Sequence, residues 1–199
     1  MIEIHGMTRG AFLVRGALAA GTTYGLGAVS PFVSGALAQG GGDVDIVNFA
    51  LTLEYLEADF YTQAAKQVKG LDSDLTDLVK ELRDNETEHV DALTATVKQL
   101  GGTPAKKPTF AFGDAFGSKD AFLKLSNTLE DTGVSAYNGA APSIESTDVL
   151  AAAGSIVQVE ARHAALIRLA RGEEPAPLAF DKSSTMDEVL AAVKPLIKA

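Results

Sequence analysis

The stretch Leu82-Arg-Asp-Asn-Glu86-Thr-Glu-His89-Val-Asp-Ala-Leu93 decides how this chain folds. Around it, apolar residues recur at spacings of three and four, which is the period of one face of an α-helix. Glu86 and His89 take two positions of that face where apolar residues are expected. The stretch Ile156-Val-Gln-Val-Glu160-Ala-Arg-His163-Ala-Ala-Leu-Ile167 repeats the pattern. Each stretch therefore predicts a helix whose glutamate and histidine side chains point into the core.

The apolar face continues in both directions from each motif. In the first helix it consists of Leu75, Leu78, Leu82, Leu93, Val97 and Leu100, and in the second of Val149, Ala153, Ile156, Ile167 and Ala170. Charged neighbours such as Glu88 and Arg162 fall on the other faces, as do Arg83 and Asp84, and are expected to be solvated.

Apolar periodicity and helix-terminating Gly or Pro residues predict four long helices. They span about residues 43–69, 73–100, 118–141 and 146–171. Gly133 and Gly139 weaken the prediction for the second half of the third helix, because glycine disfavours helix interiors. A Pro-containing linker follows, and the pair Thr185 and Glu188 predicts a capping box that opens a short last helix.

The connections indicate how the helices are arranged. The first and third connections are short, whereas residues 103–117 contain two Pro, two Gly and three Phe and form a long crossover. Those phenylalanines, Phe110, Phe112 and Phe116, either mark a partner surface or pack the crossover onto the helices. The order predicts an all-α four-helix bundle with a long crossover between helices two and three, plus a short C-terminal helix.

The other two long helices share a second pattern. Glu54 precedes Tyr61 by seven residues in the first helix, and Glu130 precedes Tyr137 by seven residues in the third. Seven residues make two helical turns, so each pair lies on one face. The chain thus consists of two similar helical hairpins, each with one Glu and one Glu-x-x-His motif.

A core that holds four carboxylates needs positive charge, because burying one unpaired carboxylate costs several kcal/mol. Only two imidazoles are available, and no Lys or Arg lies on these faces. Protonation of several carboxyls in a metal-free polar network is one solution. Two divalent or trivalent cations are a better one, and this donor set suits Fe or Mn, with Zn as an occupant in vitro. Each Glu-x-x-His would then bind one ion, while Glu54 and Glu130 cap or bridge.

Three further side chains have two readings each. Glu57 lies on the face of Glu54 and is either a seventh carboxylate beside the metal ligands or a residue at the bundle edge. Tyr61 and Tyr137 are either hydrogen-bond donors or redox relays at the site, or ordinary core tyrosines with satisfied hydroxyls.

The stretches Asn48-Phe-Ala-Leu-Thr-Leu-Glu-Tyr-Leu-Glu-Ala-Asp-Phe-Tyr61 and Val159-Glu-Ala-Arg-His-Ala164 resemble the exported ferritin-like domain proteins that include the desiccation-related group. The resemblance covers about residues 43–172. It implies a dimetal carboxylate site with the ligands Glu54, Glu86, His89, Glu130, Glu160 and His163. The chain has no cysteine, so the rubredoxin module of rubrerythrins is missing.

The N-terminal stretch has the layout of a secretory signal peptide. Residues 8–20 are positively charged and then apolar, and Ala36-Leu37-Ala38 offers a cleavage site. Thr8-Arg9 and Phe12-Leu13 are similar to a twin-arginine signal, although Gly10 replaces the second arginine, so either the Tat or the Sec route is open. An uncleaved membrane anchor is the alternative. We expect residues 1–38 to be removed, residues 39–172 to form the bundle, residues 173–199 to form the linker and last helix, and the product to be periplasmic or extracellular.

The net charge argues against some classes of binding partner. The formal charge of −9 argues against binding to nucleic acid or to an anionic membrane surface. After signal cleavage no stretch is long and apolar enough for stable membrane insertion. We therefore expect small molecules, O2 or peroxide, at the metal site, and a homo-oligomer is compatible with the pattern.

The expected function is an oxidoreductase of peroxidase, catalase or ferroxidase type that protects against oxidant or metal stress. Two alternatives stay open. One is a metal-binding or iron-storage protein, and the other is a structural stress protein, of the desiccation-related kind, whose site does not turn over.

Overall fold

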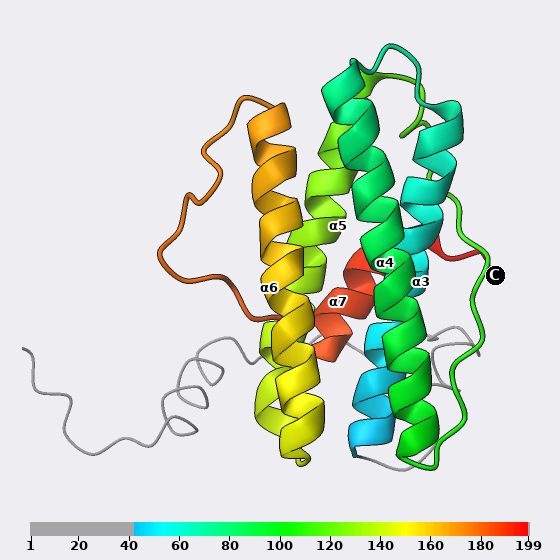
Figure 1. Ribbon diagram of the computed structural model, residues 1–199, viewed down its shortest axis with the longest axis vertical. Helices are drawn as coiled ribbons and strands as arrows, with labels where there is room; N and C mark the ends of the chain where they lie inside the picture. Colours follow the sequence, from blue (N-terminus) through cyan, green and yellow to red (C-terminus); the bar gives the residue numbers. More distant parts are fainter. Residues whose placement is uncertain (1–41, 199) are drawn as a thin grey trace, which may run out of the picture.

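The computed structural model describes residues 42–198, and this part of the chain is helical and contains no strand. The predicted signal peptide, residues 1–38, lies outside the described residues. Four long helices are followed by a short one (Figure 1): α3 (Asp43–Gln67), α4 (Ser73–Gln99), α5 (Lys119–Ala140), α6 (Thr147–Ala170) and α7 (Met186–Val193). Single 3-10 turns, η1 (Ala141–Ser143) and η2 (Lys194–Leu196), follow α5 and α7. The predicted all-α bundle with a short last helix is confirmed.

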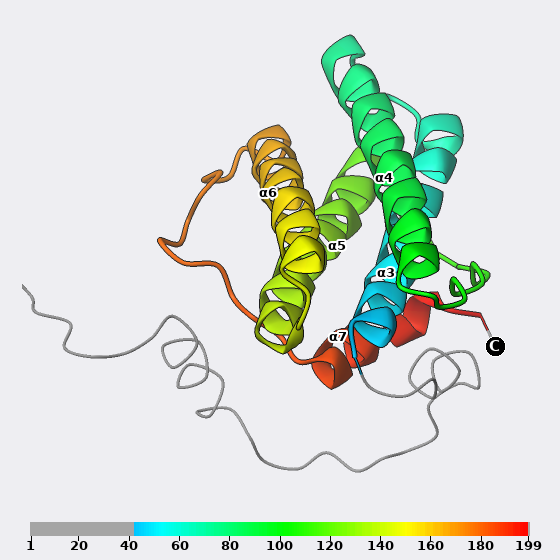
Figure 2. The ribbon, with the colours of Figure 1, turned by 60° about the horizontal axis from the view of Figure 1, so that its bottom comes forward.

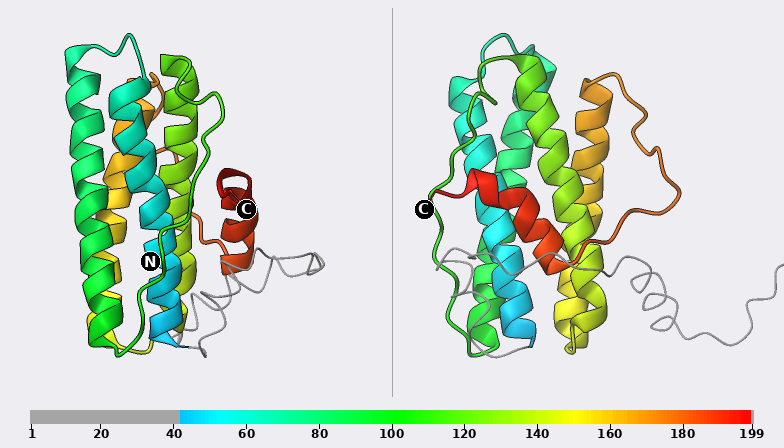
Figure 3. Two further views of the ribbon diagram at one scale, coloured as in Figure 1. Left: turned by 90° about the vertical axis from the view of Figure 1, so that its right-hand side faces the viewer. Right: turned by 180° about the vertical axis from the view of Figure 1, so that it is seen from behind.

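The four long helices form two antiparallel hairpins that pack side by side. α3 pairs with α4, and α5 pairs with α6. The crossover after α4 runs back along the whole bundle, so α5 starts at the end where α3 finishes and runs antiparallel to it (Figures 1 and 3). A crossover of about 15 residues reaches that far, because an extended chain covers about 3.3 Å per residue and a helix only 1.5 Å.

The helix ends lie within about two residues of their predicted positions, and side-chain caps explain most of the starts. Asp72 Oδ1 accepts a hydrogen bond from the Leu75 amide at 2.9 Å, and Ser118 and Ser146 cap α5 and α6 in the same way. The predicted capping box of Thr185 and Glu188 opens α7. Such caps satisfy amide groups that the first helical turn leaves without partners.

One predicted core position of α4 is less buried than its neighbour, although it still packs against the core. Val79 is buried and Leu78 is only partly buried, although the apolar period allows either between Leu75 and Leu82. Both residues are apolar at a spacing of three or four, so the choice depends on how the helix is rotated against its neighbours.

The crossover is attached to the bundle by aromatic packing. The Phe60 ring of α3 lies 5.2 Å from Phe112, 5.4 Å from Phe116 and 5.5 Å from Phe122, measured between centroids. Phe110 and Phe112 are buried. The crossover phenylalanines therefore pack the loop onto the helices, the second of the two predicted readings.

The C-terminal segment crosses behind α3 and α5 (Figures 2 and 3). Val189 and Val193 of α7 belong to the main core cluster. Beyond α7, Ile197 pairs with Phe110 of the crossover in an isolated antiparallel bridge. Within residues 42–198 no helix is long and apolar enough to span a membrane.

Gly139 allows the segment before α7 to lie directly on α5. The Ser184 amide donates to the Ser135 carbonyl at 2.9 Å. A Cβ atom on Gly139 would lie only 1.8 Å from the Ser184 carbonyl oxygen. The glycine that weakens the helix prediction is therefore explained by close backbone contact.

We expect Gly139→Ala to lower the free energy of unfolding by about 1–3 kcal/mol, because the Ser184 backbone must move. Gly154→Ala on α6 is the matched control: no atom lies within 4 Å of its added Cβ. Alanine there should raise stability by up to about 1 kcal/mol. Urea denaturation measures both, and equal values for the two variants would contradict the close contact.

Candidate metal centre

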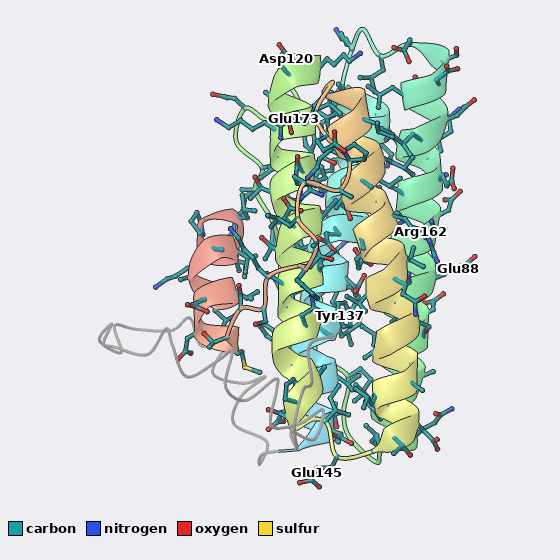
Figure 4. The ribbon with its side chains drawn as sticks, turned by 90° about the vertical axis from the view of Figure 1, so that its left-hand side faces the viewer. Glu88, Asp120, Tyr137, Glu145, Arg162 and Glu173 are labelled. Atoms are coloured by element: carbon teal, nitrogen blue, oxygen red, sulfur yellow. The ribbon has the colours of Figure 1, made fainter. Side chains whose placement is uncertain are left out.

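The six residues predicted as ligands converge in the middle of the bundle. α3 contributes Glu54, α5 contributes Glu130, and α4 and α6 each contribute one Glu-x-x-His pair. All four glutamates are fully buried, and His163 and His89 are nearly so. The labelled charges Glu88 and Arg162 lie on the outer sides of α4 and α6 (Figure 4), as expected for residues off the core face.

The candidate ligand atoms form two overlapping groups. Glu54 and His89 belong to one group, Glu130 and His163 to the other, and Glu86 and Glu160 belong to both. In each group the potential ligand atoms lie within 4.8 Å of one another. This arrangement refines the expectation from spacing: the Glu-x-x-His glutamates stand in the shared positions, whereas Glu54 and Glu130 each stand at one end.

Both imidazoles present Nδ1 to the carboxylates. His89 Nδ1 lies 3.0 Å from Glu160 Oε1 and 3.1 Å from Glu86 Oε2. His163 Nδ1 lies 2.9 Å from Glu86 Oε1 and 3.4 Å from Glu130 Oε2. The two rings are 6.3 Å apart, measured between centroids. Each histidine thus faces carboxylates from more than one helix.

Each tyrosine reaches across to the other hairpin. Tyr61 of α3 donates a short hydrogen bond to Glu130 Oε1, and Tyr137 of α5 donates to Glu54 Oε1 at 2.5 Å. The repeated Glu-x6-Tyr pattern therefore forms two crossed pairs, which sequence spacing within one helix does not reveal. Both tyrosines are hydrogen-bond donors to predicted ligands.

Two residues at the site were missed by sequence reasoning. Ser126 Oγ lies 2.6 Å from the Tyr61 hydroxyl, and its place one turn before Glu130 is a signal that helical spacing offers. The Asn85 amide lies 3.0 Å from His163 Nε2. Nothing local marks Asn85, because its partner is on another helix. The amide nitrogen Nδ2 of Asn85 is the atom that lies beside Nε2, and this contact orients the ring.

Glu57 is buried beside the site and is not a bundle-edge residue. It belongs to neither ligand group. A Cβ on Gly133 would lie 3.3 Å from Glu57 Oε1 and 3.5 Å from Glu160 Oε2. The second helix-weakening glycine of α5 thus makes room for a fifth buried carboxylate.

The residues present fit a pair of cations. Hydrogen-bond partners are missing for both oxygens of Glu160, for Glu86 Oε1, for Glu130 Oε2 and for His163 Nδ1, all of them buried. His163 Nδ1 and Glu86 Oε1 are close, yet their orientation is not that of a hydrogen bond. The buried polar side chains of residues 42–198 include no Lys or Arg. A bound cation would satisfy buried acceptor atoms that face one another and have no hydrogen-bond partner.

In the metal-free chain, bound protons neutralise part of the charge of the buried carboxylates. Burial raises the pKa of Glu54 to about 8 and holds the pKa of Glu57 and Glu160 well above the usual range. Burial alone would raise the pKa of Glu86 and lower that of His89. Contacts with His163 and His89 outweigh burial at Glu86, so its pKa falls to about 2. Contacts with Glu160, Glu54 and Glu86 outweigh burial at His89, so its pKa rises to about 12.

The fold and the site together define a helical-bundle protein with a buried carboxylate–histidine centre that can hold metal. Residues 42–173 match the family model described as the ferritin-like domain. The match covers well over half of the chain, so the chain belongs to the ferritin-like domain family, as the resemblance predicted. No curated protein matches it significantly.

The pKa shifts predict that the metal-free protein loses stability as pH rises from 6 to 9. The pKa of Glu54 is raised to about 8, so its contribution is lost between pH 4.5 and 8. The histidine contributions, complete below pH 6.5, are lost towards pH 10 for His163 and 12 for His89. Over this range Glu86 is ionised in both the folded and the unfolded state and adds no slope.

Thermal unfolding of chelator-treated protein should show Tm falling by several degrees over this range. The added stability on reloading with Fe²⁺ or Mn²⁺ should grow with pH, because binding displaces protons. A metal-free Tm that rises from pH 6 to 9 would contradict the assigned protonation.

Proposed function

We propose that this chain, after export, binds two Fe or Mn ions in the bundle core and that the loaded site reacts with O2 or peroxide in protection against oxidant or metal stress. The observation that carries the proposal is the pair of overlapping ligand groups that share Glu86 and Glu160. One ion would need a single group. Two groups with two common carboxylates favour two adjacent ions.

The composition of the groups supports Fe or Mn. Each group offers three carboxylates and one imidazole, a hard, oxygen-rich set without thiolate. The excess of buried carboxylate over imidazole favours cations of charge two or three. When bound, such a redox-active pair supplies or accepts the electrons for the reaction with O2 or peroxide.

The surrounding residues would fix the ligands and control protons. Tyr137 donates a hydrogen bond to Oε1 of Glu54, and Tyr61 donates one to Oε1 of Glu130. Each leaves the second oxygen, Oε2, facing a histidine. Preorganised ligands of this kind lower the cost of binding. Glu57, a buried carboxyl outside both groups, is placed to store a proton beside them.

The export part of the proposal is supported by the sequence of residues 8–38 alone. The storage and non-turnover alternatives differ from the main proposal in what the purified protein does. A storage protein binds many ions per oligomer, and a structural protein binds ions without consuming oxidant.

Glu86→Gln tests the proposal because Glu86 belongs to both groups. We expect elemental analysis of wild-type protein from Fe- and Mn-supplied cells to give two ions per chain, together with O2 or peroxide consumption. Glu86→Gln should lose most of both ions and at least about 90% of the activity. Even an outer-shell partner of a ligand is worth about 10–100-fold in affinity or activity, and a ligand shared by both ions is worth at least as much.

Glu88→Gln is the matched control, because Glu88 is two residues away on the exposed face of α4. It should keep two ions and full activity. Glu130→Gln, which removes a ligand from one group only, should lose one ion before the other. Two ions retained in Glu86→Gln would refute the ligand assignment, and two ions without any consumption of O2 or peroxide would refute the reaction.

A further inference from the structure

An apolar cavity lies next to the site, toward the end of the bundle where α3 begins. It has a volume of about 20 Å³ and is lined by residues of α3, α4, α5 and α6. Its lining includes Ala50, Leu93, Ala136, Tyr137, Val149 and Ala153. Ala50 precedes Glu54 by one helical turn, and Leu93 follows His89 by one turn, so the cavity adjoins the Glu54 and His89 group.

Tyr137 is the connection between the cavity and the site. Tyr137 lines the cavity, and its hydroxyl donates to Glu54 Oε1 at 2.5 Å. Figure 4 shows Tyr137 directed inward between α5 and α6. One side chain therefore separates the cavity from a predicted metal ligand.

The other half of the repeat has bulky side chains at the equivalent place. Tyr61 is preceded by Phe60, whose ring packs at 5.2 Å against Tyr61 and at 5.5 Å against Phe122. Tyr137 is preceded by Ala136. A methyl group stands where the first hairpin has a benzyl group, and this difference accounts for the space beside Tyr137.

The chemistry of the lining selects the occupant. A buried water needs two to four polar partners, and a volume of about 20 Å³ is enough for one small molecule. The lining is alkyl and aromatic apart from Thr96 and the Tyr137 hydroxyl, which Glu54 already binds. Water and hydrogen peroxide are polar and would lose hydrogen bonds on entering the cavity, whereas an apolar diatomic molecule has none to lose.

We propose that this cavity binds dioxygen and delivers it past Tyr137 to the Glu54 and His89 half of the centre. The inference rests on the proposed function and deepens it: O2 is the oxidant, and the half of the site beside Ala136 receives it. In the other half, the Phe60 ring occupies the equivalent position and packs against Tyr61 and Phe122.

Xenon, an apolar atom, tests the binding step without any metal chemistry. Crystals of the metal-loaded chain under xenon pressure should show an anomalous peak beside Ala136. Ala136→Phe, which restores the residue of the first hairpin, should abolish the peak, and Ala136→Leu does the same if the phenylalanine variant does not fold. Ala151→Leu, a matched change at an exposed position of α6 close to the cavity, should keep it.

The delivery step is tested by rates. In reduced, metal-loaded protein, Ala136→Leu or Ala136→Phe should slow O2 consumption at least about ten-fold more than peroxide consumption, while Ala151→Leu leaves their ratio unchanged. Absence of xenon from the wild-type cavity overturns the proposal whatever the metals do. Equal slowing of both oxidants, or none, also overturns it. Metal-loaded wild type that consumes neither oxidant refutes the proposed function instead, and the xenon peak reports separately on the cavity.

Discussion

The burial of five glutamates against two histidines is the constraint on which this structure depends. A helical bundle gains stability by excluding water from its core, and ionised carboxylates lose most from that exclusion. Glu54, Glu57, Glu86, Glu130 and Glu160 are all buried in one cluster. Protons satisfy part of this charge in the metal-free chain, and orphaned oxygens persist even so. Burying this many carboxylates costs free energy if they serve only to fill the core, and cation binding would offset that cost.

The two-hairpin repeat explains how the cluster is built, and its deviations explain how the halves differ. Each hairpin supplies the same ligand types, and each tyrosine binds the end carboxylate of the other hairpin. Glu57 has no carboxylate counterpart, since Gly133 occupies the equivalent position, where a Cβ atom would lie 3.3 Å from Glu57 Oε1. Ala136 likewise replaces the aromatic residue that precedes Tyr61. The candidate ligands are thus arranged nearly symmetrically, but aromatic rings pack beside Tyr61, whereas a cavity lies beside Tyr137.

The sequence predicts most of the fold because helical periodicity, caps and terminating glycines are local signals. It also identifies all six residues of the two groups that could hold a metal ion, since charged residues on the buried face interrupt the apolar pattern. Contacts between helices lie beyond local signals, which is why the Asn85–His163 pair and the crossed tyrosines appear only in three dimensions. Gly133 and Gly139 show the same limit: each weakens a helix locally and is explained by a neighbour distant in sequence. Val79 is more deeply buried than Leu78 for a similar reason, because helix rotation is set by packing.

Anomalous diffraction from crystals of protein purified with its native metal tests the central claim most directly. Data collected on either side of the Fe and Mn absorption edges identify the element and locate each ion. The account predicts two peaks inside the bundle, one bounded by Glu54 and His89, the other by Glu130 and His163, with Glu86 and Glu160 between them. No peak among these six side chains, or a single peak outside both groups, would contradict it.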